Sequence, residues 1–496
     1  MSQKKAIIIG SGIGGMAASI RLAVQGYRVE VYEKNNYPGG KLSAFEKDGF
    51  HFDAGPSLFT QPKNIEELFE LAGEVIGDYF TYLPVDIACK YFFKNGKIVN
   101  AYTDVPSFAK ELKQQLDEEP GALLSYLKRA EKLYETVGTV FLNHSLHKSK
   151  TWLNKRVIQA LATIKYPYLF KSLHQYNKSR FTSPEAIQLF NRYATYNGSN
   201  PYKAPGMLSL IPHLEQNQGT FYPKGGMISI TNALYKLALK KGVQFYFNAP
   251  VKKIIHHEGI VKAIEVNKES IAADIIVSNA DAYFTYKNLL TDHKVAGKIL
   301  KQERSSSAII FYWGIKKQFA QLQLHNIFFS KDYENEFDCI FNKKKLSNDP
   351  TVYINITSKM EKGQAPAGKE NWFVMVNAPA NIGQNWEVMK QELYSVVVKK
   401  ISNVLGENIE PLIETTHTLD PLMIEEQTAS YMGSLYGASS NSKLAAFLRH
   451  PNFTGTIKGL YFCGGSVHPG GGIPLCLKSA KIVSELISEE DKKAKQ

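Results

Sequence analysis

The sequence is poor in cysteine and has no long apolar run. Its 496 residues include four cysteines, none in a CxxC spacing, so neither a zinc site nor a disulfide framework is expected. Free thiols in a reducing cytoplasm are the simpler interpretation. The longest apolar run, residues 308–315, is far shorter than the roughly 20 residues of a spanning helix, and the run at 6–9 is too short for a signal peptide. We therefore expect a cytoplasmic chain that does not span a membrane.

Motifs of hydrolases and metal enzymes are also missing. The sequence has no GxSxG, HExxH or Walker motif. His144 and His147 lie close together, but they have no carboxylate partner in the same stretch. The sequence therefore predicts neither hydrolytic chemistry nor a metal site.

Acidic residues are absent between Glu135 and Glu185, and the chain as a whole carries a formal net charge of +13. The interval holds eight Lys or Arg residues among many aromatic and aliphatic ones. Such a mixture is typical of an interfacial helix on anionic lipid. Nucleic acid would also attract the charge, and an ordinary amphipathic helix with a solvated basic face would look the same. The segment alone leaves these three interpretations open.

The N-terminal residues 5–33 combine two short apolar runs, a glycine-rich turn and a helix pattern. The turn reads GxGxxG, and an acidic residue ends the second strand. Such glycines permit a tight turn, close approach of the backbone to a pyrophosphate, and close packing of helix on strand, while the acid can accept hydrogen bonds from a ribose. The unit predicts a dinucleotide site, with the candidate residues Gly10, Gly12, Ile13, Gly14, Gly15 and Glu33.

Two further glycine turns follow this unit. A basic residue after a double glycine can reach the pyrophosphate or the flavin end of an extended dinucleotide. A second GxGxxG is absent from the sequence, which favours one tightly held flavin over a flavin with a separate NADPH domain. The candidate residues in these turns are Lys34, Gly40, Lys41, Leu42, Gly55, Pro56 and Ser57.

Together these motifs resemble the bacterial-type carotenoid and phytoene desaturases, within the flavoprotein superfamily that includes the amine oxidases. The resemblance spans essentially the whole chain. It also rests on residues 200–205, 221–234, 275–281 and on the glycine-rich stretch 459–482. The nearest branch is the hydroxycarotenoid 3,4-desaturases. Two departures are noted: Lys41 stands where relatives usually have Arg, and Ser466 stands where many flavoproteins have Asp.

The resemblance implies FAD as the cofactor and a long polyene as the substrate, from which hydride would pass to the flavin. It places backbone contacts to the adenine at Val251. It also implies that the C-terminal loop and the helix after it complete the flavin pocket, with the helix N-terminus toward the ring. The candidate residues there are Gly464, Gly465, Ser466, Gly472, Ile473 and Pro474. No catalytic residue is assigned, and His468 is expected to hold the loop rather than to act as a base.

The expected fold class is α/β, or α+β overall: a Rossmann-like FAD-binding domain interwoven with a substrate domain of antiparallel sheet plus helices. The FAD-binding domain would comprise residues 1–90, 222–300 and 430–496, and the substrate-binding domain 91–221 and 301–429. Within the latter, 136–184 would be a helical segment that associates with the membrane. The charged tail 489–496 is expected to fray.

The predicted function is desaturation of a carotenoid, with 1-hydroxycarotenoid 3,4-desaturation favoured. Phytoene desaturation and flavin-dependent carotenoid isomerisation are the enzymatic alternatives. A prenyl-binding or lipid-binding escort protein of the same fold is the non-enzymatic one, and the intact glycines and Glu33 argue against it. The expected partners are a carotenoid and the surface of the cytoplasmic membrane, without nucleic acid; the oligomeric state is not assigned.

Overall fold

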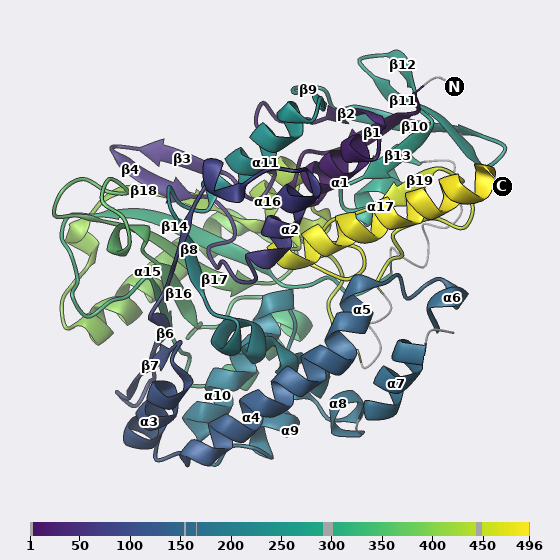
Figure 1. The fold of residues 1–496 in the computed structure, drawn as a ribbon. Coiled ribbons are helices and arrows are strands. Elements are labelled where there is room, and N and C mark those ends of the chain that lie inside the picture. The colour runs from purple at the N-terminus through teal and green to yellow at the C-terminus, as the bar shows by residue number, and fades with distance from the viewer. Residues whose placement is uncertain (1–2, 153–154, 165, 291–300, 443–448, 496) are drawn as a thin grey trace.

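Two sheets and a helical region form the frame of the molecule (Figure 1). The structure is a computed structural model that describes residues 3–152, 155–164, 166–290, 301–442 and 449–495. A five-stranded sheet lies beside a seven-stranded sheet, and the helices of residues 105–191 gather below both in Figure 1.

The five-stranded sheet is parallel, with the order β19-β13-β1-β2-β9. It joins strands from the start, the middle and the end of the chain. Its second strand lies inside the predicted unit 5–33, and another lies inside the 275–281 motif. The strands are β1 (Lys5–Ile9), β2 (Arg28–Tyr32), β9 (Gln244–Tyr246), β13 (Ile275–Ser278) and β19 (Leu460–Phe462).

Both faces of this sheet are covered, which explains why β1 reads as an unbroken apolar run. Ala6 and Ile8 pack with helices α1 (Ile13–Val24), α11 (Ile228–Lys240) and α17 (Ile473–Lys495). Ile7 and Ile9 pack on the other side, with residues of a three-stranded antiparallel sheet. The strands of that sheet are β10 (Val251–His257), β11 (Ile260–Val266) and β12 (Glu269–Ala272).

The seven-stranded sheet has the order β18-β14-β17-β16-β15-β6-β7. It was expected to be antiparallel, but β15 and β6 pair in parallel. These two strands are far apart in the chain and no hairpin joins them, so their pairing is not held to the antiparallel direction. Helix α15 (Trp386–Leu405) covers one face through a cluster that includes Trp313 and Trp372. The strands are β6 (Ile87–Phe92), β7 (Ile98–Tyr102), β14 (Ser307–Ile315), β15 (His325–Phe328), β16 (Val352–Asn355), β17 (Glu370–Ala378) and β18 (Ile413–Leu419).

Short helices make up most of residues 105–191. In the first part of the predicted segment 136–184, apolar side chains pack into a cluster around Phe141 and Val157. Leu173 and Tyr176 of the later part pack into a second, larger cluster. Residues 153–154 and 165 of this segment lie outside the described part of the chain. The helices are α3 (Val105–Leu116), α4 (Pro120–Leu133), α5 (Thr139–Asn143), α6 (Ser149–Trp152), α7 (Lys155–Thr163), α8 (Tyr166–Phe170), α9 (Leu173–Lys178) and α10 (Pro184–Asn191).

The remaining elements connect these parts. None of the described helices is both long and apolar enough to cross a membrane. The domain limits remain predictions, and residues 291–300, 443–448 and 496 within them lie outside the described part. The connecting elements are β3 (Ala44–Lys47), β4 (Phe50–Asp53), α2 (Lys63–Leu71), β5 (Tyr82–Pro84), β8 (Phe221–Pro223), α12 (Ala282–Phe284), α14 (Tyr333–Asp338) and α16 (Pro421–Thr428).

The charged tail was expected to fray, but this prediction is wrong: α17 continues to Lys495. Asp491 pairs with Lys4 at 2.7 Å, and the hydroxyl of Tyr461 donates to Glu490 at 2.6 Å. These bonds attach the tail to the five-stranded sheet, at its edge strand β19 and at the residue before β1.

Candidate active site

A single cavity of about 1390 Å³ runs between the five-stranded and the seven-stranded sheets. It is larger than the roughly 300–1,000 Å³ of an ordinary small-molecule pocket, so it has room for more than one ligand group. Every candidate site residue named from the sequence lines this cavity except Gly15. The glycine turn of the N-terminal unit, the two further glycine turns and the C-terminal loop therefore meet at one place.

The first glycine turn lies at the N-terminus of α1 and leaves no room for side chains. A Cβ on Gly12 would lie 2.7 Å from Nδ2 of Asn279, and one on Gly14 would lie 2.7 Å from its Oδ1. A Cβ on Gly15 would collide with the carbonyl oxygen of Gly10. Gly15 thus serves the packing of α1 on β1, as predicted for the third glycine, and not the cavity wall.

Glu33 ends β2 and organises the same turn. One carboxylate oxygen accepts hydrogen bonds from the backbone N–H of Ser11 at 2.8 Å and from its hydroxyl at 2.9 Å. The other accepts from the N–H of Asn35 at 2.9 Å. Glu33 is buried and lines the cavity. A carboxylate accepting three bonds still has free lone pairs, so Glu33 retains the capacity to accept from a ribose hydroxyl.

Two lysines contribute positive charge to the cavity wall. The ammonium of Lys41 donates to the carbonyl of Leu435 at 3.0 Å, and that of Lys34 donates to the carbonyl of Glu426. Burial lowers the pKa of each ammonium, while Asp281 acts in the opposite direction on the pKa of Lys41. Lys41 follows Gly40, so the departure from Arg leaves a cation in the same turn.

The turn of residues 53–57 is folded tightly against Lys41. A Cβ on Gly55 would collide with the carbonyl oxygen of Lys41, so only glycine fits there. Pro56 and Ser57 line the cavity, and the hydroxyl of Ser57 lies 2.7 Å from that of Tyr353. Leu42 is buried beneath the turn. Val251 lines the cavity from the first position of β10.

The C-terminal loop closes the cavity from the third part of the chain. A Cβ on Gly464 would lie 2.7 Å from Oδ1 of Asn279, so this glycine approaches the same amide as the first turn. Gly472 has φ +102°, and Ile473 and Pro474 begin α17. The N-termini of α1 and α17 therefore both border the cavity, where they favour negative charge.

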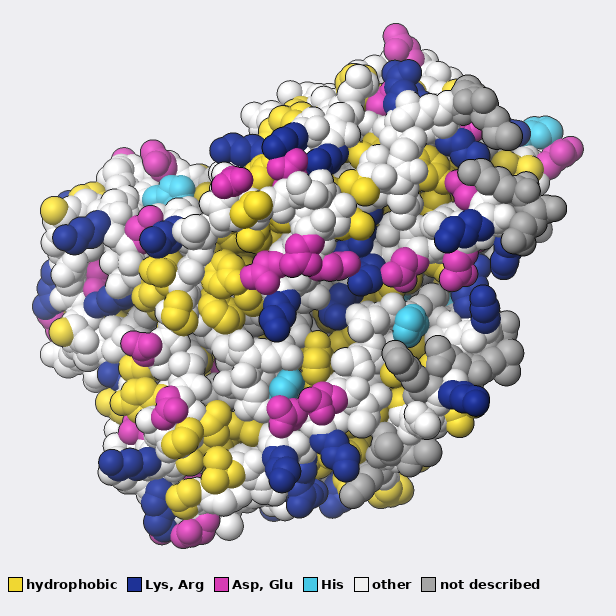
Figure 2. Space-filling model, in the orientation of Figure 1, with side chains coloured by type: hydrophobic (Ala, Val, Ile, Leu, Met, Phe, Trp, Pro, Cys, Tyr) yellow, Lys and Arg dark blue, Asp and Glu magenta, His cyan; other side chains and the backbone are white. Residues whose placement is uncertain are grey.

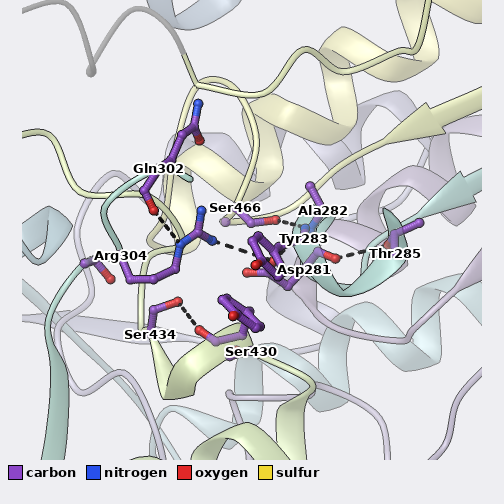
Figure 3. A network of polar contacts seen from close by, with 12 residues as sticks. Asp281, Ala282, Tyr283, Thr285, Gln302, Arg304, Ser430, Ser434 and Ser466 are labelled. Carbon is purple, nitrogen blue, oxygen red and sulfur yellow. Dashed lines mark hydrogen bonds and ion pairs between the residues drawn. The ribbon is translucent and has the colours of Figure 1, made fainter. Parts of the chain in front are cut away.

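Ser466 stands in a polar network beside this loop (Figure 3). Its hydroxyl accepts from the N–H of Ala282 at 2.9 Å, next to Asp281. Asp281 lies 4.0 Å from the guanidinium of Arg304, and burial raises the pKa of its carboxyl. An Asp at position 466 would bring a second carboxylate close to Asp281, which gives a physical reason why a serine suits this chain.

His468 does not border the cavity. Its ring is buried, and its Nε2 donates to the carbonyl of His144 at 2.9 Å. This arrangement agrees with the expected structural role of His468. In the described ranges, no group of three or more His, Cys, Asp or Glu side chains is placed to hold a metal ion.

The other arm of the cavity is mainly apolar. Its wall is the face of the seven-stranded sheet opposite α15. A buried ion pair also borders it: Arg192 donates to Glu215 at 3.0 Å. The apolar and aromatic lining residues include Phe45, Ile310, Tyr312, Ile327, Phe373, Met375 and Leu419.

Several lining residues were missed by the sequence reasoning. Asn279 touches the N-terminal glycine turn and Gly464 of the C-terminal loop, and it lies in the 275–281 motif that was noticed only as part of a pattern. Arg192, Glu215, His325 and Tyr353 carry no local motif. They come together only because α10, the 206–217 turns and the second sheet converge on the cavity.

The lining fits a flavin dinucleotide. Glycine turns without side chains, a buried carboxylate with lone pairs left to accept hydrogen bonds, and two helix N-termini match an extended molecule with a pyrophosphate in its middle. The broad aromatic arm matches a flat ring system and an apolar substrate.

Three comparisons with known proteins agree with this geometry. Residues 13–488 match the family model described as flavin containing amine oxidoreductase. A 1-hydroxycarotenoid 3,4-desaturase from Flavobacterium sp. (strain P99-3) is 52% identical over 98% of this chain and 99% of its own. A 4,4'-diaponeurosporene oxygenase from Staphylococcus haemolyticus (strain JCSC1435) is 31% identical over 98% of both chains.

Solved structures share the fold at low sequence identity. An oxidoreductase from Methanosarcina mazei has a TM-score of 0.64 at 16% identity, over 98% of this chain and 100% of that one. A triple mutant of a putrescine oxidase has a TM-score of 0.65 at 13% identity, over 98% of this chain and 99% of that one.

Proposed function

The chain belongs to the flavin-containing amine oxidoreductase family, and on that premise we propose that it desaturates a 1-hydroxycarotenoid at the 3,4 position. It is an FAD-dependent oxidoreductase. The observation that carries the proposal is the single cavity, in which a dinucleotide cradle continues into an aromatic, apolar arm. The relative named as a 1-hydroxycarotenoid 3,4-desaturase, 52% identical over nearly the whole chain, supports this choice of substrate.

FAD, when bound, supplies the ring that accepts a hydride. The residues of this chain bind and orient the cofactor and the substrate, and they exclude water from the site. Glu33 and the glycine turns would hold the adenosine and pyrophosphate, and Lys41 would place a positive charge near the bound dinucleotide. The aromatic wall around Tyr312 and Phe373 would hold a polyene flat and keep water out of the arm.

The protein does not require a strongly tuned base for such a reaction. Charge that develops on a polyene is spread over its conjugated system. His325 and His417 both line the cavity. Burial lowers the pKa of each, that of His325 to about 4, so the His325 ring is neutral at neutral pH. We assign no catalytic base.

The proposal is tested with purified protein, FAD, a quinone acceptor and carotenoids dissolved in liposomes. An acyclic carotenoid with a 1-hydroxyl group should give a product with a red-shifted spectrum and a mass lower by two hydrogens. Conversion of phytoene alone would favour phytoene desaturation instead. A product of unchanged mass would favour isomerisation. Failure to convert any carotenoid would refute the proposal.

We also propose that helices α6 to α9 rest on the cytoplasmic membrane, which dissolves such a substrate. The apolar inner side of this segment packs on the body, yet aromatic side chains remain on its outside. Tyr166 is 67% exposed and Phe170 49%, and their rings stack at 4.7 Å. Lys150 and Lys155 are exposed in the same segment, and Figure 2 shows further Lys and Arg side chains over the lower helical part of this face. Exposed aromatics beside basic groups complement an anionic lipid surface.

Vesicle flotation tests this second proposal. The variant K150E/K155E, and separately Y166S/F170S, should lower binding to vesicles that contain anionic lipid. The matched control is K362E/K399E, which reverses two exposed lysines elsewhere on the surface. Equal binding by the control and both test variants would refute membrane docking through this segment.

A further inference from the structure

A chain of hydrogen bonds leads from the cavity wall into the second sheet. The hydroxyls of Ser57 and Tyr353 are 2.7 Å apart, and the hydroxyl of Tyr353 is 2.7 Å from Nδ1 of His325. Asn355 contacts the same nitrogen through Nδ2 at 3.2 Å. Ser57, Tyr353 and His325 all line the cavity.

The direction of each hydrogen bond in this chain follows from its inner end. Nδ2 of Asn355 also contacts the carbonyl of Leu324 at 3.2 Å, and a carbonyl only accepts, so this atom is the amide nitrogen. An amide nitrogen donates, and Nδ1 of His325 must therefore accept. The ring then carries its proton on Nε2, in agreement with the burial that lowers its pKa to about 4.

The outer hydrogen bonds are ordered by this result. Because Nδ1 lacks a proton, Tyr353 donates its hydroxyl hydrogen to it. Tyr353 can then only accept from Ser57, and Ser57 donates inward. The serine oxygen, which is half-buried at the cavity wall, is left with lone pairs alone. The hydroxyl oxygen of Ser57 is thus a hydrogen-bond acceptor that faces the cavity, and its partners Tyr353 and His325 fix its orientation.

We propose that Ser57 accepts a hydrogen bond from the terminal hydroxyl group of the substrate, and that Tyr353 and His325 position it for that role. The inference rests on the proposed function and deepens it. A tertiary alcohol brings one O–H into an otherwise apolar arm, and leaving that group unpaired would oppose binding. The inward-directed chain favours a ligand that donates over one that only accepts.

The place of Ser57 agrees with the place of the reaction. In a 1-hydroxycarotenoid the carbon that bears oxygen is separated from the 3,4 bond by a single carbon, so the hydroxyl must bind close to the reacting bond. Ser57 lies in the same turn as Gly55, which packs on Lys41, and Lys41 is one of the residues proposed to lie near the bound dinucleotide. A recognition group deep in the far end of the apolar arm would not meet this requirement.

The test compares a 1-hydroxycarotenoid with the carotenoid that lacks the hydroxyl and is otherwise identical. For each enzyme, the ratio of kcat/KM for the two substrates is measured, together with the binding of each by quenching of tryptophan fluorescence. The variant S57A should lower the ratio about tenfold, as expected for the loss of one neutral hydrogen bond. Most of the change should come from a lower kcat/KM and weaker binding of the hydroxylated substrate. S57T keeps a hydroxyl and should retain most of the preference.

Tyr353→Phe provides an independent variant if S57A folds poorly. It frees the serine hydroxyl to rotate and should also reduce the ratio, while Y394F, a matched change on α15 outside the cavity, should not. Flavin content and thermal midpoint confirm that each variant is folded. An unchanged ratio in both S57A and Y353F would overturn the inference, as would a wild-type enzyme that converts both substrates equally. Wild-type enzyme that converts neither would instead overturn the proposed function.

Discussion

His468 and His144 are joined by a hydrogen bond of 2.9 Å from the imidazole Nε2 to the backbone carbonyl. The bond ties the last glycine-rich loop to the end of α5, in the helical region. A histidine inside a flavin loop invites a catalytic interpretation, but this ring is buried and does not reach the cavity. The C-terminal loop that lines the cavity is therefore anchored just before the helices proposed to rest on the membrane.

The first prediction concerns pH. Burial lowers the pKa of His468 from 6.5 to about 4, so the unfolded chain binds a proton at this ring more tightly than the folded protein does. Its contribution to stability is complete above pH 6.5 and is lost as the pH falls from there toward 4. Between pH 7 and pH 5 the loss for this residue is about 2 kcal/mol.

The variant H468Q can still donate to His144 but does not titrate. Urea unfolding at both pH values should therefore show a smaller acid loss in H468Q than in the wild type. If the two proteins lose the same stability, the ring is not the source of the pH dependence.

The second prediction concerns Glu33. Gln at this position has one oxygen for the two groups that now receive one carboxylate oxygen each, the backbone N–H groups of Ser11 and Asn35. Its amide nitrogen would face a donor. We expect E33Q to weaken FAD binding about ten- to hundredfold, measured as recovery of flavin fluorescence on dilution. Unchanged affinity would mean that Glu33 holds the turn without contributing to the cofactor.

The third prediction separates packing glycines from incidental ones. Ala at position 15 places a methyl group against the carbonyl oxygen of Gly10, which must move together with β1. We expect G15A to cost about 1–3 kcal/mol and to lower flavin content. The matched control is G121A in the first turn of α4, where a Cβ meets nothing within 4 Å. Comparable thermal midpoints for the two variants would contradict the packing role.

Local patterns in the sequence were enough to predict the nucleotide sheet. The unit at residues 5–33 depends on neighbours within a few residues, through the pattern of apolar residues and glycine geometry. The glycine turns could be picked out because each is a short motif with its own steric reason, and their role in binding the cofactor stays a prediction. The charged tail was misread because its partners, Lys4 and Tyr461, lie far from it along the chain.

The substrate end could not be predicted from local patterns. Ser57 and Tyr353 are 296 positions apart, and they meet only after β16 takes its place in the second sheet. The place of Asn279 in the site likewise follows from its contacts with glycines that are distant in the sequence, and not from its neighbours in the chain. Contacts of this kind depend on the register and packing of distant strands, which single-sequence periodicity does not specify.

The last prediction concerns the buried ion pair of Arg192 and Glu215. Burial alone would raise the pKa of Glu215, but Arg192 and the hydroxyls of Tyr193 and Tyr196 hold that pKa below its usual value. Removing the carboxylate in E215A leaves a buried guanidinium and two tyrosine hydroxyls without their acceptor. We expect a loss of about 3–5 kcal/mol in the free energy of unfolding.

Two further variants make this prediction sharp. The double variant R192M/E215L removes both charges, and it should recover most of that stability while making the arm of the cavity more apolar. K113A, which removes an exposed lysine that bonds Asp117 and Glu119, should change the free energy of unfolding far less than E215A, because solvent screens exposed ion pairs. The test is to compare the urea midpoints of the wild type, E215A, R192M/E215L and K113A. If E215A is no less stable than K113A, the ion pair does not hold the wall of the cavity, because a buried and uncompensated guanidinium would have to cost more than an exposed lysine.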